Sequence, residues 1–216
     1  MTENNLELLL QKPYFTISAV AQITGVSTQA ARSRASRWSK SGKIIRIKEG
    51  YYISHDFYLK NSDKFGFLKM IAAIIQPFSY ISGEYVLQKN QILTEATYTI
   101  TCVTAKNTQT ISNKIANFDY KNIKEKLYLG FKQNRYFGIP VNEASKSKAL
   151  FDYLYFKSLP RVPFGKNYNL AEDLRLNLVD WQKSEIDEFG VYVNLSAMTK
   201  MREVYENLKR NIWHNL

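Results

Sequence analysis

This sequence of 216 residues has almost no cysteine, no long apolar run and no leader-like start. Cys102 is the only cysteine, so no disulfide can form within the chain, and the reducing cytoplasm is the expected location. The longest apolar run, residues 70–75, is far shorter than a membrane helix. The start, MTENNLELLLQK, is acidic and polar, unlike a secretory signal. We therefore expect a soluble, cytoplasmic protein with no membrane partner.

The residue patterns of common enzyme classes are missing too. Neither His55 nor His214 has a partner at metal-ligand spacing, and the nine glycines form neither GxGxxG nor a phosphate-binding loop. The triplet DYK at residues 119–121 matches the carboxylate-x-lysine of metal-dependent nucleases, but residues 97–118 hold no second carboxylate. We expect no catalytic residue, no metal and no cofactor, so the protein is predicted not to be an enzyme.

Carboxylates are also missing from the stretch STQAARSRASRWSKSGKIIRIK, residues 27–48. Its positive residues are Arg32, Arg34, Arg37, Lys40, Lys43, Arg46 and Lys48. The whole chain has 30 Lys and Arg against 19 Asp and Glu, a formal net charge of +11, which favours nucleic acid or an acidic membrane surface as partner. Only this stretch concentrates positive charge without an acid to neutralise it. The alternative interpretation is an ordinary solvated basic helix.

The first 60 residues show the order of elements of a winged helix-turn-helix. Apolar spacing and capping residues predict helices at 6–10, between Thr16 and Gly25 and between Ser27 and Gly42, followed by the hairpin strands 44–48 and 51–54. Helix, helix, turn, helix and hairpin are typical of that DNA-binding motif. We therefore expect a winged helix-turn-helix domain at residues 1–60.

The helix after Ser27 would place Ala31, Ala35 and Trp38 on one buried stripe. The opposite face is polar, and its residue types suit the major groove, because Arg pairs with guanine, Gln with adenine, and Ser reaches bases or phosphates. The helix N-terminus and the hairpin would hold phosphates. The predicted DNA-binding residues are Ser27, Thr28, Gln29, Arg32, Ser33, Ser36, Arg37, Lys40, Lys43, Arg46 and Lys48.

The charge pattern changes near residues 58–63, which predicts a second domain at residues 61–216. Apolar periodicity predicts helices at 65–76, 82–90 (capped by Ser82), 144–157, 181–192 and 195–212, and strands at 97–104, 118–123, 126–131 and 135–143. The expected fold class is α+β: the winged helix-turn-helix followed by a mixed α/β domain with a small sheet and C-terminal helices.

Four blocks of this second domain resemble the AbiEi family of transcriptional regulators, the antitoxins of type IV toxin–antitoxin systems. They are YISGEYVLQKNQILTEATYTITCVTAKNT (80–108), FDYKNIKEKLYLGF (118–131), GIPVNEASKSKALFDYLY (138–155) and LRLN (174–177). Sequences of this type commonly carry a Thr-Pro-Glu-Lys-Ala-Leu-like string followed by Asp. Lys148, Ala149, Leu150 and Asp152 match it, whereas residues 145–147 depart. Lys148 and Asp152 are spaced for an intrahelical ion pair, with a functional surface as the alternative.

The resemblance implies an α/β antitoxin domain and two activities. Members of the family repress their own operon, here by binding double-stranded DNA of the protein's own promoter, expected to carry inverted repeats. They also counteract a cognate nucleotidyltransferase-like toxin, directly or indirectly. The chain lacks the Gly-Ser and paired aspartates of the toxin itself. Two alternatives remain open: a stand-alone winged-helix transcription factor with a ligand-sensing second domain, and, less favoured, a DNA-acting enzyme.

Overall fold

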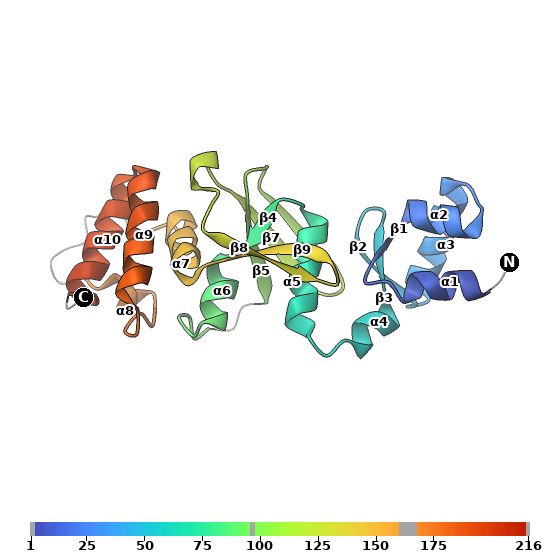
Figure 1. The fold of residues 1–216 in the computed structure, drawn as a ribbon, viewed down its shortest axis with the longest axis horizontal. Coiled ribbons are helices and arrows are strands. Elements are labelled where there is room, and N and C mark those ends of the chain that lie inside the picture. The colour runs from blue at the N-terminus through green and yellow to red at the C-terminus, as the bar shows by residue number, and fades with distance from the viewer. Residues whose placement is uncertain (1–2, 96–97, 160–167, 215–216) are drawn as a thin grey trace.

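The computed structural model describes residues 3–95, 98–159 and 168–214. The molecule is elongated, with the N-terminal helices at one end, the larger sheet in the middle and the last two helices at the other end (Figure 1). None of the helices in these ranges is long and apolar enough to cross a membrane. The predicted mixture of α and β structure is confirmed, with a small sheet, a larger mixed sheet and C-terminal helices.

Six elements form the N-terminal unit, which we define as residues 3–54. They are α1 (Glu3–Leu10), β1 (Phe15–Thr16), α2 (Ile17–Thr24), α3 (Thr28–Lys40), β2 (Ile44–Lys48) and β3 (Tyr51–Ser54). The strands form an antiparallel sheet in the order β1-β3-β2. The three predicted helices and the predicted hairpin are confirmed, whereas β1 is too short to produce a pattern in the sequence.

Capping residues determine where α2 and α3 begin and end. The Thr16 hydroxyl accepts a hydrogen bond from the Ala19 N–H at 3.2 Å, which starts α2. The Ser27 hydroxyl accepts one from the Ala30 N–H at 3.2 Å, which starts α3. Gly25 ends α2 with a φ of 63°, a left-handed conformation that glycine adopts at little cost. The turn between the two helices is therefore specified by local sequence.

The second unit, residues 55–214, is built on a six-stranded mixed sheet. Its helices are α4 (His55–Lys60), α5 (Lys64–Ile75), α6 (Gly83–Lys89), the 3-10 helix η1 (Glu125–Leu127), α7 (Lys146–Phe156), α8 (Leu170–Asp173), α9 (Lys183–Ser196) and α10 (Thr199–Asn211). Its strands are β4 (Ser79–Ile81), β5 (Thr99–Thr104), β6 (Gln109–Ser112), β7 (Asn117–Asn122), β8 (Phe131–Tyr136) and β9 (Ile139–Ala144). The strand order is β6-β7-β5-β4-β9-β8.

The helices of the second unit lie on either side of this sheet. Helix α5 lies between the sheet and the N-terminal unit, and α7 lies between the sheet and the pair α9–α10 (Figure 1). The pairs β4–β9 and β5–β7 are parallel, and the other neighbours are antiparallel. Strand β5 is an inner strand of this order and is covered on both faces, so Thr101 on one face and Thr104 on the other are both buried. Thr97, the predicted first residue of that strand, lies outside the described residues.

Two of the predicted strands are wrong. Residues 126–131 do not form a strand, because the chain makes the short helix η1 there and β8 begins only at Phe131. Residues 135–143 are not one strand but parts of the antiparallel pair β8–β9. The turn between them lies at Phe137 and Gly138, which have φ values of 48° and 77°. The glycine was the available signal for this hairpin.

The hairpin β2–β3 packs on both of its faces. Ile44 and Tyr52 belong to the core of the N-terminal unit, together with residues of α1, α2 and α3. Ile45, Ile47 and Ile53 belong instead to the large core of the second unit, which includes the buried side of α5. Apolar packing therefore crosses the predicted domain boundary at residue 60.

Candidate nucleic-acid interface

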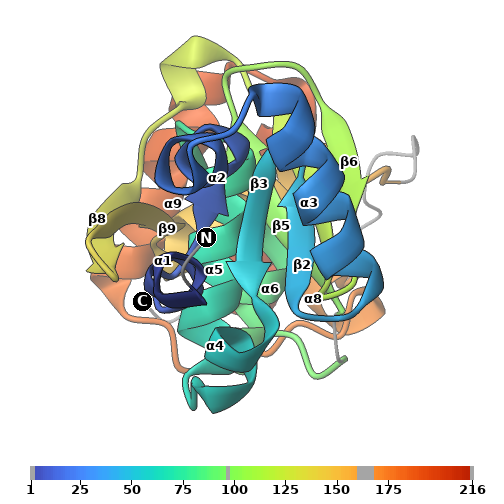
Figure 2. The same cartoon turned by 90° about the vertical axis from the view of Figure 1, so that its right-hand side faces the viewer.

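Helix α3 has one buried face and one exposed basic face. Ala31 and Ala35 are completely buried, and Trp38 packs against the same core while remaining half-buried. The helix lies on the outer surface at the N-terminal end of the molecule (Figure 2). Every side chain of α3 that was predicted to face DNA lies on the exposed side, as the helical periodicity requires. These exposed residues are Gln29, Arg32, Ser33, Ser36, Arg37 and Lys40.

The charges on this face are not paired with any carboxylate of the residues that the structure describes. Among the described residues, no ion pair involves Arg32, Arg37 or Lys40. The helix itself has no acidic residue in its first turn, and two of these three positive charges, Arg37 and Lys40, lie in its last turn. The surface of α3 is therefore available to a polyanion without breaking an existing ion pair.

The residues at the start of α3 are exposed and partly engaged in local hydrogen bonds. Ser27 and Thr28 are both exposed, and Ser27 already accepts the capping hydrogen bond. Its hydroxyl hydrogen remains able to donate to a phosphate. Ser33 donates its hydroxyl to the Gln29 carbonyl at 3.2 Å, which leaves its oxygen as an acceptor.

The basic residues of the hairpin differ in what they contact. Lys43 and Arg46 are exposed, and Arg46 lies opposite Tyr52 in the strand register. Lys48 does not project freely. Its ammonium donates to the carbonyl oxygens of Ile74 at 2.7 Å and Ile75 at 3.0 Å, and lies 4.2 Å from the centroid of the Tyr51 ring.

These contacts give Lys48 a role that the sequence pattern did not predict. The last carbonyl groups of a helix lack partners within the helix and carry partial negative charge, so a lysine at the end of α5 is favourable. Burial, and to a smaller extent the charge of Lys106, lowers the pKa of Lys48. Lys48 therefore connects the hairpin to the second unit, and we remove it from the candidate DNA-binding residues.

A fully buried polar cluster lies in the second unit. The Lys148 ammonium donates to Asp152 Oδ1 at 2.7 Å, and both side chains are completely buried. The hydroxyls of Tyr80 and Ser82 donate to Asp152 Oδ2 at 2.9 and 2.7 Å. The Lys148 ammonium also lies 4.8 Å from the centroid of the Phe151 ring. Burial raises the pKa of Asp152 and lowers the pKa of Lys148.

This cluster settles two expectations. The intrahelical ion pair between Lys148 and Asp152 is confirmed, and the alternative of a functional surface is wrong because neither side chain reaches the surface. Ser82 occupies the N-cap position of α6 as predicted, but its side chain makes no capping hydrogen bond and donates to Asp152 instead. The sequence could not predict that Ser82 and Tyr80 bind Asp152, because both lie some seventy residues before it along the chain.

The carboxylate of the nuclease-like triplet contacts one hydroxyl and one lysine. Asp119 accepts a hydrogen bond from the Thr110 hydroxyl at 3.0 Å and lies 3.9 Å from the Lys121 ammonium. Within the described part of the chain, no group of three or more His, Cys, Asp and Glu side chains could hold a metal ion. Asp119 is therefore not part of such a group among the residues that the structure describes.

No protein-family model matches this chain, and no curated protein matches it significantly. Functional interpretation therefore depends on the geometry of α3 and its hairpin and on the sequence blocks that resemble antitoxins. Two of those blocks meet in the buried cluster, since Tyr80 and Ser82 come from one and Lys148 and Asp152 from another.

Proposed function

We propose that the N-terminal unit is a winged helix-turn-helix that binds double-stranded DNA, with α3 as the recognition helix. The observation that carries the proposal is the division of α3 into a buried face, at Ala31 and Ala35, and an exposed basic face without a carboxylate. Hydrophobic packing needs only the first face. The second face has the residue types that read bases and contact phosphates in a major groove.

The dimensions of α3 suit this role. Gln29 and Arg32 lie in its N-terminal half, where contacts to base edges are usual. Arg37 and Lys40 lie in its last turn and are placed for phosphates. From Gln29 to Lys40 the helix rises about 16 Å, which exceeds the width of a major groove, about 12 Å. Arg46 on the hairpin extends the positive surface toward flanking backbone.

We further propose that this DNA is the promoter of the protein's own operon, with inverted repeats, and that the protein counteracts a nucleotidyltransferase-like toxin. The support for this part is the resemblance of residues 80–108, 118–131, 138–155 and 174–177 to AbiEi antitoxins. These blocks all lie in the second unit, so toxin neutralisation is assigned to residues 61–216 and DNA binding to residues 1–60.

The DNA-binding proposal is tested by a matched pair of triple variants. One replaces Arg32, Arg37 and Lys40 by alanine, and the control replaces the exposed Lys124, Lys126 and Lys132 of the second unit. Both lose three positive charges. On a labelled promoter fragment, the first should lose about a hundredfold or more in affinity and the control less than about fivefold. Equal losses would show that only net charge matters and that α3 is not the interface.

The antitoxin proposal is tested in cells that produce the toxin. The same α3 variant, expressed with the toxin from unrelated promoters, should still rescue growth, because its side chains point away from the core and the second unit is untouched. Unrelated promoters are needed because lost repression would otherwise raise toxin and antitoxin together. If the variant is folded and abundant but fails to rescue, neutralisation uses the basic helix and the division of roles is wrong.

A further inference from the structure

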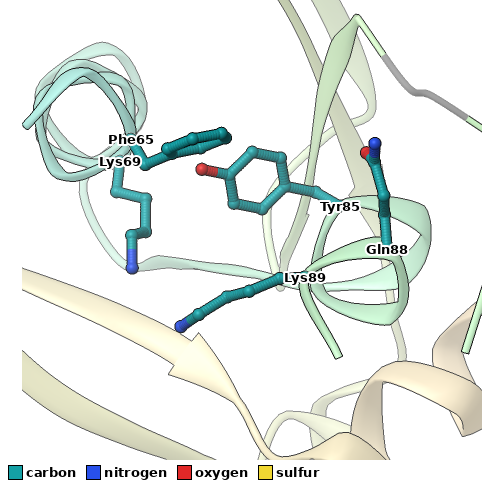
Figure 3. A pocket seen from close by; sticks show the side chains of 5 residues that line it. All are labelled: Phe65, Lys69, Tyr85, Gln88 and Lys89. Atoms are coloured by element: carbon teal, nitrogen blue, oxygen red, sulfur yellow. The ribbon is translucent and has the colours of Figure 1, made fainter. Parts of the chain in front are cut away.

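A pocket of about 390 Å³ lies between α5 and α6 in the second unit. Its lining residues are Phe65, Lys69, Tyr85, Gln88 and Lys89 (Figure 3). The volume is within the range of small-molecule sites. Each helix contributes an aromatic residue and a lysine four positions later, Phe65 with Lys69 and Tyr85 with Lys89, so that the two pairs face the same space.

One wall of the pocket is aromatic. Phe65 is 70% exposed although it is a large apolar side chain. Its ring is tilted by 53° to that of Tyr85, with the two centroids 6.4 Å apart. Aromatic surface in this open arrangement is favourably covered by another ring or by an aliphatic group.

The floor of the pocket is positively charged. Lys69 and Lys89 come from different helices and bind the two oxygens of Glu143, on β9, at 2.5 Å each. Each ammonium has three hydrogens and uses one of them on this carboxylate. Two positive charges therefore meet one negative charge, which leaves the floor with a net charge of +1 and with donors that can turn to a ligand.

A buried hydroxyl points into the same space. Tyr85 is only 6% exposed, and within the described part of the chain its hydroxyl has no hydrogen-bond partner. Figure 3 shows this hydroxyl directed from α6 toward Phe65 on α5, across the pocket. A buried hydroxyl without a partner is unfavourable, and a ligand oxygen placed here would accept its hydrogen.

We propose that this pocket binds a small aromatic carboxylate. The ring of such a ligand would lie against Phe65 and Tyr85, and its carboxylate would accept hydrogen bonds from Lys69, Lys89 and the Tyr85 hydroxyl. A net charge of +1 and apolar walls match a monoanion better than a phosphate dianion. Asp63 also acts on Tyr85 electrostatically, but it does not line the pocket, and its carboxylate caps α5, where it accepts from the Gly66 N–H at 2.8 Å.

Ligand binding in this pocket does not depend on DNA binding or on toxin neutralisation. All residues that line the pocket belong to the second unit, and a ligand there is compatible with both proposed activities, DNA binding and toxin neutralisation. An empty pocket would leave α3 and the hairpin unaffected, and loss of DNA binding in α3 variants would leave the pocket unaffected.

The test measures binding of three matched probes to the full-length chain by nuclear magnetic resonance titration. The probes are phenylpropanoate, the neutral phenylpropanol and the cationic phenylpropylamine. We expect saturable binding of phenylpropanoate with a dissociation constant on the order of a millimolar or lower. The shifts should centre on residues 64–89. The alcohol should bind about tenfold more weakly and the amine not at all. Equal binding of all three probes, or no saturation by the carboxylate at about 10 mM, would overturn the proposal.

Variants distinguish a ligand site from a structural one. Lys69→Met should weaken phenylpropanoate binding about tenfold, whereas the exposed control Lys124→Met should leave it unchanged. Tyr85→Phe should weaken binding severalfold without lowering the melting temperature, because the hydroxyl it removes has no partner among the described residues. If Tyr85→Phe lowers the melting temperature and leaves binding unchanged, the hydroxyl is structural and the proposal is wrong.

Discussion

The ammonium group of Lys48 donates a hydrogen bond to the carbonyl oxygen of Ile74 at 2.7 Å. This contact joins the last residue of strand β2 to the C-terminal end of α5, across the boundary predicted from the charge pattern. The Asn113 side chain makes a second connection of this kind, because its amide donates to the Ile47 carbonyl at 3.2 Å. The hairpin that follows the candidate recognition helix is thus held by the second unit.

Lys48 and Arg46 should therefore respond differently to substitution. Lys48→Met should lower the free energy of unfolding by about 1–2 kcal/mol, because two hydrogen bonds from a charged donor are lost. Arg46→Ala should leave stability almost unchanged but lower the slope of log affinity against log salt by about one for any DNA sequence. Urea unfolding and salt titrations check both. An unchanged salt slope for Arg46→Ala would mean that the hairpin does not touch the DNA backbone.

Arg32 is expected to read a base. It is exposed in the N-terminal half of α3, and Arg32→Ala should weaken binding to the operator by about 1–3 kcal/mol. Preference at one base pair should relax at the same time. The measurement compares operator with random DNA of equal length at one salt concentration. Equal losses on the two DNAs would identify Arg32 as a phosphate contact.

The buried pair in α7 should be costly to break at either end. Asp152→Asn should destabilise the protein by about 3–5 kcal/mol, because it leaves the Lys148 ammonium buried without a counter-charge. Adding Lys148→Met to Asp152→Asn should recover part of this loss, because the double variant no longer buries an unpaired ammonium. Its amide oxygen can still accept from Ser82. A double-mutant cycle by urea unfolding measures the coupling. Additive losses would show that the two charges do not stabilise each other.

Glu143 should make stability depend on pH in the acid range. Its burial alone would raise its pKa, but hydrogen bonds and charges from Lys69 and Lys89 outweigh this effect, and the pKa of Glu143 lies below its usual value of 4.5. The stabilisation is therefore present above pH 4.5 and is lost as the pH falls through the lower pKa of the folded state. Glu143→Gln should be less stable than the natural protein at pH 7 by about 1–2 kcal/mol.

The gap between Glu143→Gln and the natural protein should close as the pH is lowered from about 4.5, the ordinary glutamate value. Thermal unfolding at several pH values measures it. A gap of constant size would mean that the shape of the side chain, and not its charge, accounts for the difference.

Local signals in the sequence predicted the N-terminal unit well. Thr16, Gly25 and Ser27 determine where α2 and α3 begin and end, and the spacing of Ala31 and Ala35 fixes which side of α3 is exposed. Each of these features acts within a few residues of its own position. The two faces of α3 could therefore be assigned from the order of residues alone.

The missed features depend on contacts between distant segments. In the sequence, Lys48 is indistinguishable from the other basic residues of the hairpin. Its partners, two carbonyl groups at the end of α5, follow only from how α5 packs beside the hairpin. Ser82 has the right type for a helix cap, but Asp152 competes successfully for its hydroxyl. The pocket between α5 and α6 had a faint signal, the aromatic residue four positions before a lysine in each helix, and nothing in the sequence paired the two helices.

Because the hairpin packs on both of its faces, the proposed DNA-binding unit cannot be transferred to another protein without exposing apolar side chains. Residues 1–60 transferred to another protein would carry Ile45, Ile47 and Ile53 with them, and these side chains would lie uncovered in water. Within this chain, the same packing fixes the direction of α3 relative to the six-stranded sheet. In the proposed complex with an inverted repeat, the distance between half-sites should therefore be determined by how the second units of two copies associate, and not by the length of a linker.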